Sequence, residues 1–466
     1  MSESSQSVPP AAESRPGVEE PSEAIRAAMT ADGAPALAIE AFLDNVRRWA
    51  AGERGTIPVA SLEPIGELPA ADDFAEPSAS ELSALLARTV VIKLNGGLGT
   101  SMGLQRAKSL IEVKSGLTFL DIIVRQILHL RAVHSAPLPL LFMTSFSTHQ
   151  DTLEAMRTRH PGFRNPSPLP LVFQQHRVPK LDPKTRMPLG SPEHPELAWC
   201  PPGHADIYHA LQTTGILNVL LAAGYRYAFI SNADNLGAIL SPSILGQFAA
   251  SGAPFWMEVT RRTHADRKGG HLARSAETHR LLLRESAQCP PDETDDFQDI
   301  DRHAYFNTNN LWLSLPALAG LLKETNGLPP LPLIVNRKTL DPAKPTSPPA
   351  IQLESAMGAL IADFPDASAV IVPRTRFAPV KTTSDLLAIR SDAYVLSSSY
   401  HLALHPSRGD IPPTITLDPR YYKMLPDFER RIPNPPPSLL RCDSLTIASD
   451  HTFAADTPPL VGDVTL

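Results

Sequence analysis

Cysteine is scarce in this 466-residue chain, which contains three, at positions 200, 289 and 442. These residues lie far apart and form no Cys-x-x-Cys pair, so the sequence supplies neither a disulfide framework nor a structural zinc site. Such sparing use of cysteine is typical of a protein that works in reducing surroundings.

Long apolar runs and clusters of positive charge are also missing. No run of about 18 apolar residues indicates a membrane span. The N-terminal Met-Ser-Glu-Ser-Ser-Gln lacks the basic start and apolar core of a secretory signal. The net charge is −7 with the two signs interspersed, which argues against nucleic-acid binding. We therefore expect a cytoplasmic protein without a membrane or nucleic-acid partner, in which an anionic substrate would need local lysines and a metal.

The chain alternates patterns typical of helices and strands. Helical spacing covers 118–132 and 205–223, and short apolar strand candidates lie at 89–94, 138–144, 170–174, 226–231 and 254–260. This alternation predicts an α/β fold with a mainly parallel, helix-covered sheet. Two helices are expected between residues 22 and 49 and a third at 80–88. The first 22 residues are predicted to be disordered. Proline-rich stretches at 176–202 and 328–350 are expected to be loops over the sheet face and candidate lids.

A glycine-rich turn follows the first of these strands. The segment 94–103 reads Leu-Asn-Gly-Gly-Leu-Gly-Thr-Ser-Met-Gly, and Lys108 lies a few residues further on. Glycines permit positive φ and let backbone N–H groups approach a phosphate, and the lysine adds a full positive charge. The spacing matches neither the phosphate-loop motif nor the Gly-x-Gly-x-x-Gly dinucleotide motif. The turn is therefore predicted to be a nucleotide site of another kind.

The turn closely resembles the nucleotide-binding loop of the eukaryotic-type UTP:glucose-1-phosphate uridylyltransferases, also called UDP-glucose pyrophosphorylases. Further segments that resemble this family follow in the same order: Pro-Pro-Gly-His at 201–204, Ser-Asn-Ala-Asp-Asn-Leu-Gly at 231–237, Phe-Asn-Thr-Asn-Asn-Leu-Trp at 306–312 and Val-Lys-Thr-Thr-Ser-Asp at 380–385. Together the segments span most of residues 89–400. The resemblance rests on several ordered motifs rather than on one glycine loop.

The resemblance implies a Rossmann-like, GT-A-like nucleotidyltransferase domain with a mixed, mainly parallel sheet at 89–400. It would follow a disordered tail at 1–22 and a helical extension with a linker at 23–88. A small C-terminal domain at 401–466 resembles the start of the family's left-handed β-helix. This tail stops earlier than in relatives with a full β-helix, so a monomer or a low-order homo-oligomer is expected.

The implied reaction is Mg²⁺-dependent transfer of the uridylyl group of UTP to glucose 1-phosphate, which gives UDP-glucose and pyrophosphate. The sugar phosphate would attack the α-phosphorus directly, so no nucleophilic side chain is required, and the protein would mainly supply positioning and positive charge. By resemblance, the uridine end would be held by the turn, and Lys108 would meet the phosphates. The turn residues concerned are Leu94, Asn95, Gly96 and Gly97.

Three more segments are implied to hold the nucleotide and the metal. Gln175 matches the uracil-reading glutamine, since an amide offers a donor and an acceptor together, although neighbouring Gln174 is a competitor. Gly203 and His204 would approach the nucleotide and the sugar phosphate. Asn232 and Asp234 follow a strand, and the Asp234 carboxylate suits Mg²⁺, with phosphate oxygens completing the metal's shell.

The remaining candidates are assigned to the sugar and to the transition state. Asn307 and Asn309 alternate along an extended run, so both are expected on one face of a strand, where amides suit sugar hydroxyls. Lys381 is implied to reach the phosphates from the side opposite Lys108 and is the candidate main transition-state cation. Lys268-Gly269-Gly270 resembles a sugar-site turn. The segment 353–358 fits a packed helix as well as a site and is left out.

Less specific explanations exist for each candidate: a solvated lysine after a tight turn, a surface amide, a structural histidine, a helix-capping aspartate or the polar face of an edge strand. A pyrophosphorylase with another or a broader sugar specificity is the nearest alternative enzyme. A catalytically silent nucleotide-sugar binding protein is the alternative from another class. Such a protein would be expected to have lost Lys108, Asp234 or Lys381, and all three are present.

Overall fold

The computed structural model describes residues 19–409 and 411–466, and these residues divide into two compact units. Unit 1 contains the described residues up to Gly55 together with 177–202 and 333–354. Unit 2 contains 56–176, 203–332 and 355–466. Most of the predicted disordered tail lies outside the described residues, but Glu19 already begins the first helix. The division also separates the N-terminal helices from the linker that the sequence grouped with them.

Unit 1 is built from three separate segments around a small apolar core. Helices α1 (Glu19–Ala31) and α2 (Ala36–Ala50) supply residues such as Ile25 and Phe42. Strands β14 (Ile334–Thr339) and β15 (Pro349–Glu354) pair antiparallel over six positions, and β7 (Val178–Pro179) pairs with β8 (Trp199–Cys200). The stretches 176–202 and 328–350, expected to be loops, therefore contain short paired strands as well as loops. Their apolar residues, including Leu181 and Leu333, are buried in unit 1.

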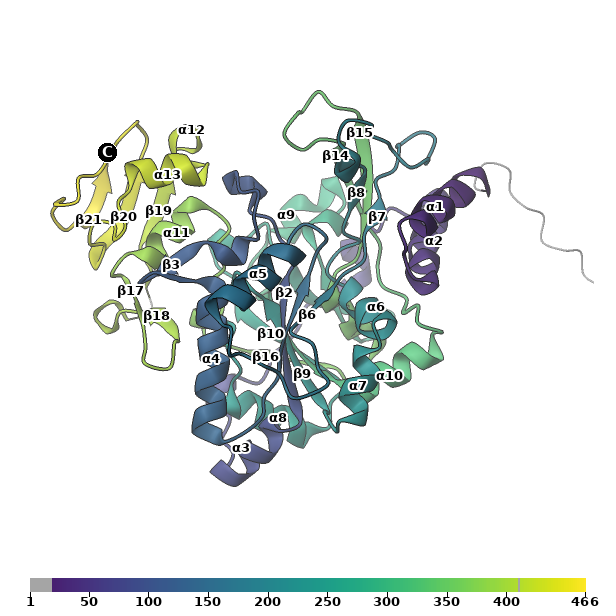
Figure 1. The fold of residues 1–466 in the computed structure, drawn as a ribbon, viewed down its shortest axis with the longest axis horizontal. Coiled ribbons are helices and arrows are strands. Elements are labelled where there is room, and N and C mark those ends of the chain that lie inside the picture. Colours follow the sequence, from purple (N-terminus) through teal and green to yellow (C-terminus); the bar gives the residue numbers. More distant parts are fainter. Residues whose placement is uncertain (1–18, 410) are drawn as a thin grey trace, which may run out of the picture. The chain divides into compact units, whose positions relative to one another are not determined.

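Unit 2 contains a mixed ten-stranded sheet, whose main path runs β1-β11-β13-β9-β2-β5-β6. Its strands β2, β6, β9, β10 and β16 are labelled in Figure 1. Strands β9, β2, β5 and β6 are parallel neighbours, and β13 joins β9 antiparallel. The mixed α/β fold expected from the sequence is confirmed. The bounds of the path strands are β1 (Leu62–Glu63), β2 (Thr89–Asn95), β5 (Leu140–Thr144), β6 (Val172–Gln174), β9 (Tyr227–Asn232), β11 (His271–Ser275) and β13 (Tyr305–Ser314).

Three strands lie off this path. β10 (Phe255–Arg261) pairs antiparallel with β13 and parallel with β16 (Ser368–Ile371), and β12 (Leu281–Arg284) pairs with β11. All seven residues of β2 are buried, as expected for a strand covered on both faces. The parallel strands end at one edge of the sheet, so the residues that follow them gather there.

Helices with clear end signals connect the strands of unit 2. Thr118 and Asp121 form a capping box at the start of α4 (Phe119–His134), and Ser78 and Glu81 do the same for α3 (Ala79–Leu86). The helix expected over 205–223 is interrupted at Gly215, whose φ of +74° stops a regular helix. The remaining helices that connect the sheet strands are α5 (His149–Arg159), α6 (Asp206–Thr213), α7 (Ile216–Ala222), α8 (Pro242–Ser251), α9 (Thr294–Phe297) and α10 (Leu315–Glu324).

The C-terminal part of unit 2 carries its own small sheet. Strands β19 (Thr414–Leu417), β20 (Arg441–Ile447) and β21 (Val461–Thr465) are parallel neighbours. Helix α11 (Thr383–Arg390) packs against β19, and α12 (Pro419–Tyr422) and α13 (Leu425–Arg431) lie between β19 and β20 in the chain. Among the described residues, every helix is too short or too polar to cross a membrane.

Candidate functional site

Several of the polar residues predicted from the sequence lie at or just after the ends of parallel strands in unit 2. Asn95 ends β2 and is in register with Thr144 of β5, which in turn is in register with Gln174 of β6. Asn232 ends β9 and pairs with Leu94 of β2. The Asn95 side chain is 3% exposed and donates to the Thr152 hydroxyl at 3.0 Å. Asn95 therefore fixes α5 to the start of the turn.

The glycine turn folds back on itself. Lys108 N donates to Gly97 O at 3.2 Å, and Leu98 forms a bridge with Ala107. Among the four glycines of the turn, only Gly103 has positive φ, at +73°, so the expectation of positive φ along the loop is wrong for the others. Gly96 is needed for space instead, because a Cβ there would lie 2.8 Å from the Gln175 amide nitrogen.

Gln175 is the better placed of the two candidate glutamines. Its side chain is buried against Gly96, whereas Gln174 is exposed. Gln175 N donates to Thr144 O at 2.8 Å, which continues the pairing of β6 with β5 beyond the end of the strand. A buried amide at the base of the turn is suited to recognising a ligand that lies over Gly96.

Lys108 and Asp234 form an ion pair across the sheet edge. Lys108 Nζ donates to Asp234 Oδ2 at 2.7 Å, and the two side chains are 15% and 23% exposed. The backbone carbonyl of Asp234 accepts from Val380 N at 3.2 Å. The candidate phosphate-binding cation and the candidate metal ligand are thus each other's partner in this state.

His204 has a defined tautomer. Its Nδ1 accepts from Met357 N at 2.9 Å, and burial lowers the pKa of His204 to about 4. The ring is therefore neutral at pH 7, and its proton lies on Nε2, which leaves Nε2–H as the free donor. Gly203 precedes it with φ of +90°. Met357 belongs to the segment 353–358, which the sequence does not assign to the site, and its N–H sets the tautomer of His204.

Asn307 and Asn309 meet in a way that the sequence pattern does not predict. A β-bulge between Glu258 and Val259 of β10 shifts the register opposite them, and Asn309 has φ of +57°. The expected extended alternation is therefore wrong at this point. The bulge turns the two amides toward each other instead: Asn307 Nδ2 donates to Asn309 Oδ1 at 3.0 Å, and Asn309 N donates to Asn307 Oδ1 at 2.9 Å.

Glu285 belongs with this group and was missed from the sequence. It follows β12, accepts a hydrogen bond from Asn307 and interacts electrostatically with the positive charge of Lys381. Burial raises the pKa of Glu285, while Lys381 and the Asn307 hydrogen bond act in the opposite direction. A Cβ on Gly270 would lie 2.5 Å from Glu285 Oε2. The sequence feature that could have identified Glu285 is a carboxylate directly after the strand Leu-Leu-Leu-Arg.

Lys381 lies at the entrance to α11. Its backbone N donates to Asp385 Oδ2 at 2.9 Å, and the Thr382–Asp385 capping box fixes the start of the helix. The Lys381 side chain is exposed. No salt bridge among residues 19–409 and 411–466 includes Lys381, although its positive charge acts on the buried Glu285 carboxyl group.

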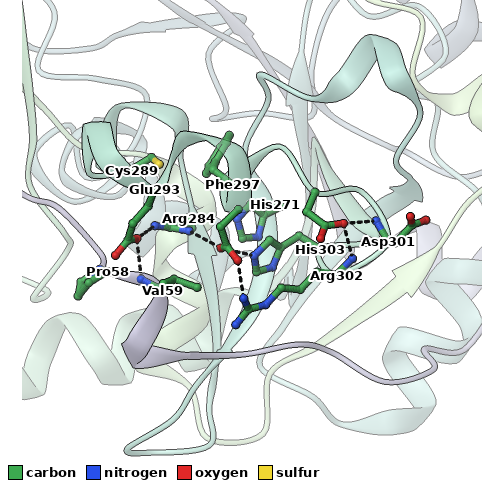
Figure 2. Close-up of polar contacts among 12 residues, drawn as sticks. Pro58, Val59, His271, Arg284, Cys289, Glu293, Phe297, Asp301, Arg302 and His303 are labelled. Carbon is green, nitrogen blue, oxygen red and sulfur yellow. Dashed lines mark hydrogen bonds and ion pairs between the residues drawn. The ribbon is translucent and has the colours of Figure 1, made fainter.

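A buried polar cluster anchors the strand from which Glu285 extends (Figure 2). Arg284 is fully buried and pairs with Glu293, which also accepts from Val59 N at 2.7 Å. The rings of His271 and His303 stack with centroids 3.9 Å apart. The cluster holds Arg284, the residue directly before Glu285, although Arg284 Nε, His271 Nε2 and His303 Nδ1 have no hydrogen-bond partner among the described residues.

This cluster and His204 predict a stability that falls in acid. Burial lowers the pKa of His271 to about 2 and also lowers that of His303. Below about pH 6.5 the unfolded histidines gain protons that the folded protein excludes. The free energy of unfolding should therefore decrease as pH falls from about 6.5 toward 4, by up to about 1.4 kcal/mol per pH unit for each histidine that stays neutral.

Urea unfolding between pH 7.5 and 5 checks this prediction. His271→Phe keeps a ring against His303 and removes one titrating group, so the decrease should become shallower. His194→Gln, at an exposed position, is the control and should leave the slope unchanged. An equal slope in all three proteins would contradict the prediction.

A metal site formed by protein groups alone is not found among the described residues, because no three of their His, Cys, Asp or Glu side chains gather suitably. Asp234 is a single carboxylate at a strand end. That donor set fits a hard ion that takes most of its ligands from bound phosphates and water.

Comparison with known proteins agrees across sequence and structure. Residues 39–458 match the family model described as UTP–glucose-1-phosphate uridylyltransferase. A protein of that name from Solanum tuberosum is 38% identical over 431 residues, 91% of this chain and 87% of the relative. One from Saccharomyces cerevisiae is 41% identical over 373 residues, 80% of this chain and 72% of the relative. The structure of a UDP-glucose pyrophosphorylase mutant from Leishmania major in complex with UDP-glucose has a TM-score of 0.88 and 42% identity, and it covers 96% of this chain and 94% of that one.

Proposed function

Because the chain belongs to the UTP–glucose-1-phosphate uridylyltransferase family, we propose that it converts UTP and glucose 1-phosphate to UDP-glucose and pyrophosphate. The observation that carries the proposal is the gathering of Gln175, the Lys108–Asp234 pair and Lys381 with Glu285 on segments that follow strands of one sheet. These groups supply base recognition and charges of both signs, which a reaction between two anions requires.

On the nucleotide side, we assign the uridine to the turn formed by Leu94, Asn95, Gly96 and Gly97. Gln175 reads the uracil edge, and its burial beside Gly96 supports this role over Gln174. Lys108 binds the phosphates once it leaves Asp234. Asp234 would hold Mg²⁺ together with phosphate oxygens, and the ion would neutralise phosphate charge when bound.

On the sugar side, we assign the hydroxyls of glucose to Asn307, Asn309 and Glu285. The two amides and the carboxylate supply donors and acceptors at one place. Gly203 and His204 approach the sugar phosphate, with His204 donating from Nε2, and Asn232 lies at the end of β9 between the two sides. Lys381 is the cation that stabilises the charge developing on the transferred phosphoryl group. The sugar phosphate oxygen attacks the α-phosphorus in line, and pyrophosphate leaves.

The finer architecture is also part of the proposal. We assign the sheet of unit 2 to a Rossmann-like, GT-A-like nucleotidyltransferase domain, and β19, β20 and β21 to the start of a left-handed β-helix, which their parallel pairing supports. Three free cysteines support a cytoplasmic, reducing location. We infer a monomer or a low-order homo-oligomer, which size-exclusion chromatography with light scattering would measure.

The first experiment measures UDP-sugar formation from UTP with glucose 1-phosphate, and separately with galactose 1-phosphate, in the presence of Mg²⁺ and inorganic pyrophosphatase. Rapid, glucose-selective formation that EDTA abolishes and excess Mg²⁺ restores is expected. Equal rates with both sugars would replace glucose specificity by broader specificity. Tight UDP-glucose binding without product formation would indicate a silent binding protein instead.

Gln175→Ala should weaken selection of the base. The variant removes the amide beside Gly96 and leaves the phosphate-binding groups in place. Loss of one neutral hydrogen-bonding partner costs about 1–3 kcal/mol, so KM for UTP should rise about 10- to 100-fold. Gln174→Ala, at the exposed neighbour, is the matched control and should behave like the wild type. A larger effect of Gln174→Ala would transfer the role to that residue.

A further inference from the structure

Asn235 connects the turn that carries Asp234 to the segment that leads into Lys381. It follows Asp234 directly, and its side chain is 2% exposed. Its Oδ1 accepts from Ala378 N at 3.0 Å and from Gly237 N at 3.2 Å, and its Nδ2 donates to Arg376 O at 3.0 Å. One buried amide therefore satisfies three backbone groups on two segments about 140 residues apart in the chain.

The backbones of the two segments are also joined directly. Val380 N donates to Asp234 O at 3.2 Å, and Asn235 forms a β-bridge with Pro379. Gly237 lets them approach, because a Cβ at this position would lie 2.2 Å from Thr375 O. Even a methyl group would push the segments apart, so their separation is fixed on both sides of Asn235.

A buried ion pair holds the far end of the connection. Arg376 contacts Glu258 through two hydrogen bonds, at 2.9 and 2.6 Å, and also donates to Ile239 O at 2.8 Å. Glu258 is fully buried and accepts from Asn310 and from Trp312, each at 2.9 Å. Arg376 is anchored to β10 and β13 in this way. The segment from Arg376 to Lys381 is therefore fixed at its start by this ion pair and further along by Asn235.

We propose that Asn235 is a positioning residue for uridylyl transfer: it holds the Lys381 segment at a fixed distance from the Asp234 turn, so that the two charges meet the reacting phosphates together. The inference rests on the proposed function. Asn235 touches neither substrate in this role and acts through Lys381 and Asp234. Misplacement of a charged group by about 1 Å can cost on the order of 100-fold in rate, which sets the scale of the expected effect.

The test separates the acceptor of Asn235 from its donor. Asn235→Asp keeps an oxygen for Ala378 N and Gly237 N but loses the donor to Arg376 O. Asn235→Ala loses both. We expect kcat to fall about 10-fold in the first variant and about 100-fold in the second, with KM for UTP nearly unchanged because Gln175 and Gly96 are untouched. Gly237→Ala should lower kcat without altering the amide. Asn45→Ala, on α2 of unit 1, is the control and should match the wild type.

A double-mutant cycle with Lys381→Ala distinguishes positioning from a general loss of structure. If Asn235 acts through Lys381, Asn235→Ala should cause little further loss of kcat in the Lys381→Ala background. Additive losses, or a fall in thermal midpoint with no change in kcat at a temperature where the variant is folded, would overturn the inference. An active wild type with fully active Asn235 variants would reject the positioning role and leave the proposed function intact, whereas an inactive wild type would reject the function itself.

Discussion

Lys381→Ala should lower kcat for UDP-glucose formation by about 100- to 1,000-fold, the loss typical when one preorganised donor to a transition state is removed. The Lys381 side chain is exposed, and α11 is capped by Thr382 and Asp385 rather than by the ammonium group. Its removal should therefore change the free energy of unfolding by no more than about 0.5 kcal/mol. KM for UTP should change little if the charge matters mainly in the transition state.

Two variants make this expectation specific. Lys381→Arg keeps the charge but replaces a compact ammonium by a planar guanidinium, so it should recover only part of the lost rate. Lys423→Ala removes another exposed lysine from the same unit and should retain wild-type kcat. If Lys381→Ala turned over like the wild type, Lys381 would lose its role, and the search for the main cation would move to Lys108.

The sequence predicts the strand ends well because they depend on local patterns. The apolar run Val90–Ile92 and the turn after it indicate β2. Asp234 likewise follows a strand that its apolar residues indicate. The candidates at 175, 204, 234 and 381 could therefore be listed from the residues and their resemblance. Their adjacency depends on the strand order of the sheet, which local patterns only suggest.

The features that were missed depend on tertiary structure. The bulge at Asn309 results from pairing between β13 and β10, so the run Phe-Asn-Thr-Asn-Asn-Leu-Trp looks extended in isolation. Glu285 is distinguished only by its neighbours Asn307 and Lys381. Residues 328–350 look like a proline-rich loop in the sequence because the core that this part of the chain completes includes two helices from the N-terminal region.

The Lys108–Asp234 ion pair should exchange partners when substrates bind. With its two side chains 15% and 23% exposed, the pair neutralises two opposite charges at the sheet edge. UTP phosphates would then take Lys108, and Mg²⁺ would take Asp234. The ion pair between Lys108 and Asp234 would be replaced by two pairings, Lys108 with phosphate and Asp234 with Mg²⁺. Neither side chain would then be left buried and unpaired.

Single and double variants distinguish exchange from a purely structural salt bridge. Asp234→Asn should raise the Mg²⁺ concentration needed for half-maximal activity and lower kcat by about 1,000-fold, and Lys108→Gln should mainly raise KM for UTP. If the pair were only structural, the double variant Lys108→Gln/Asp234→Asn would restore much of the activity by removing the unpaired charge. Exchange predicts that the double variant is at least as impaired as the worse single variant.

The control is the exposed ion pair Arg157–Glu154 on α5, whose side chains are 73% and 59% exposed. Replacing both with Gln should change neither kcat nor the Mg²⁺ requirement, because exposed pairs contribute at most about 1 kcal/mol to stability. Activity measured against free Mg²⁺ and against UTP in the same series separates the two roles. A recovered double variant would show that Lys108 and Asp234 serve each other and not the substrates, and the metal would then have to be sought at another carboxylate, with Glu285 the first to test.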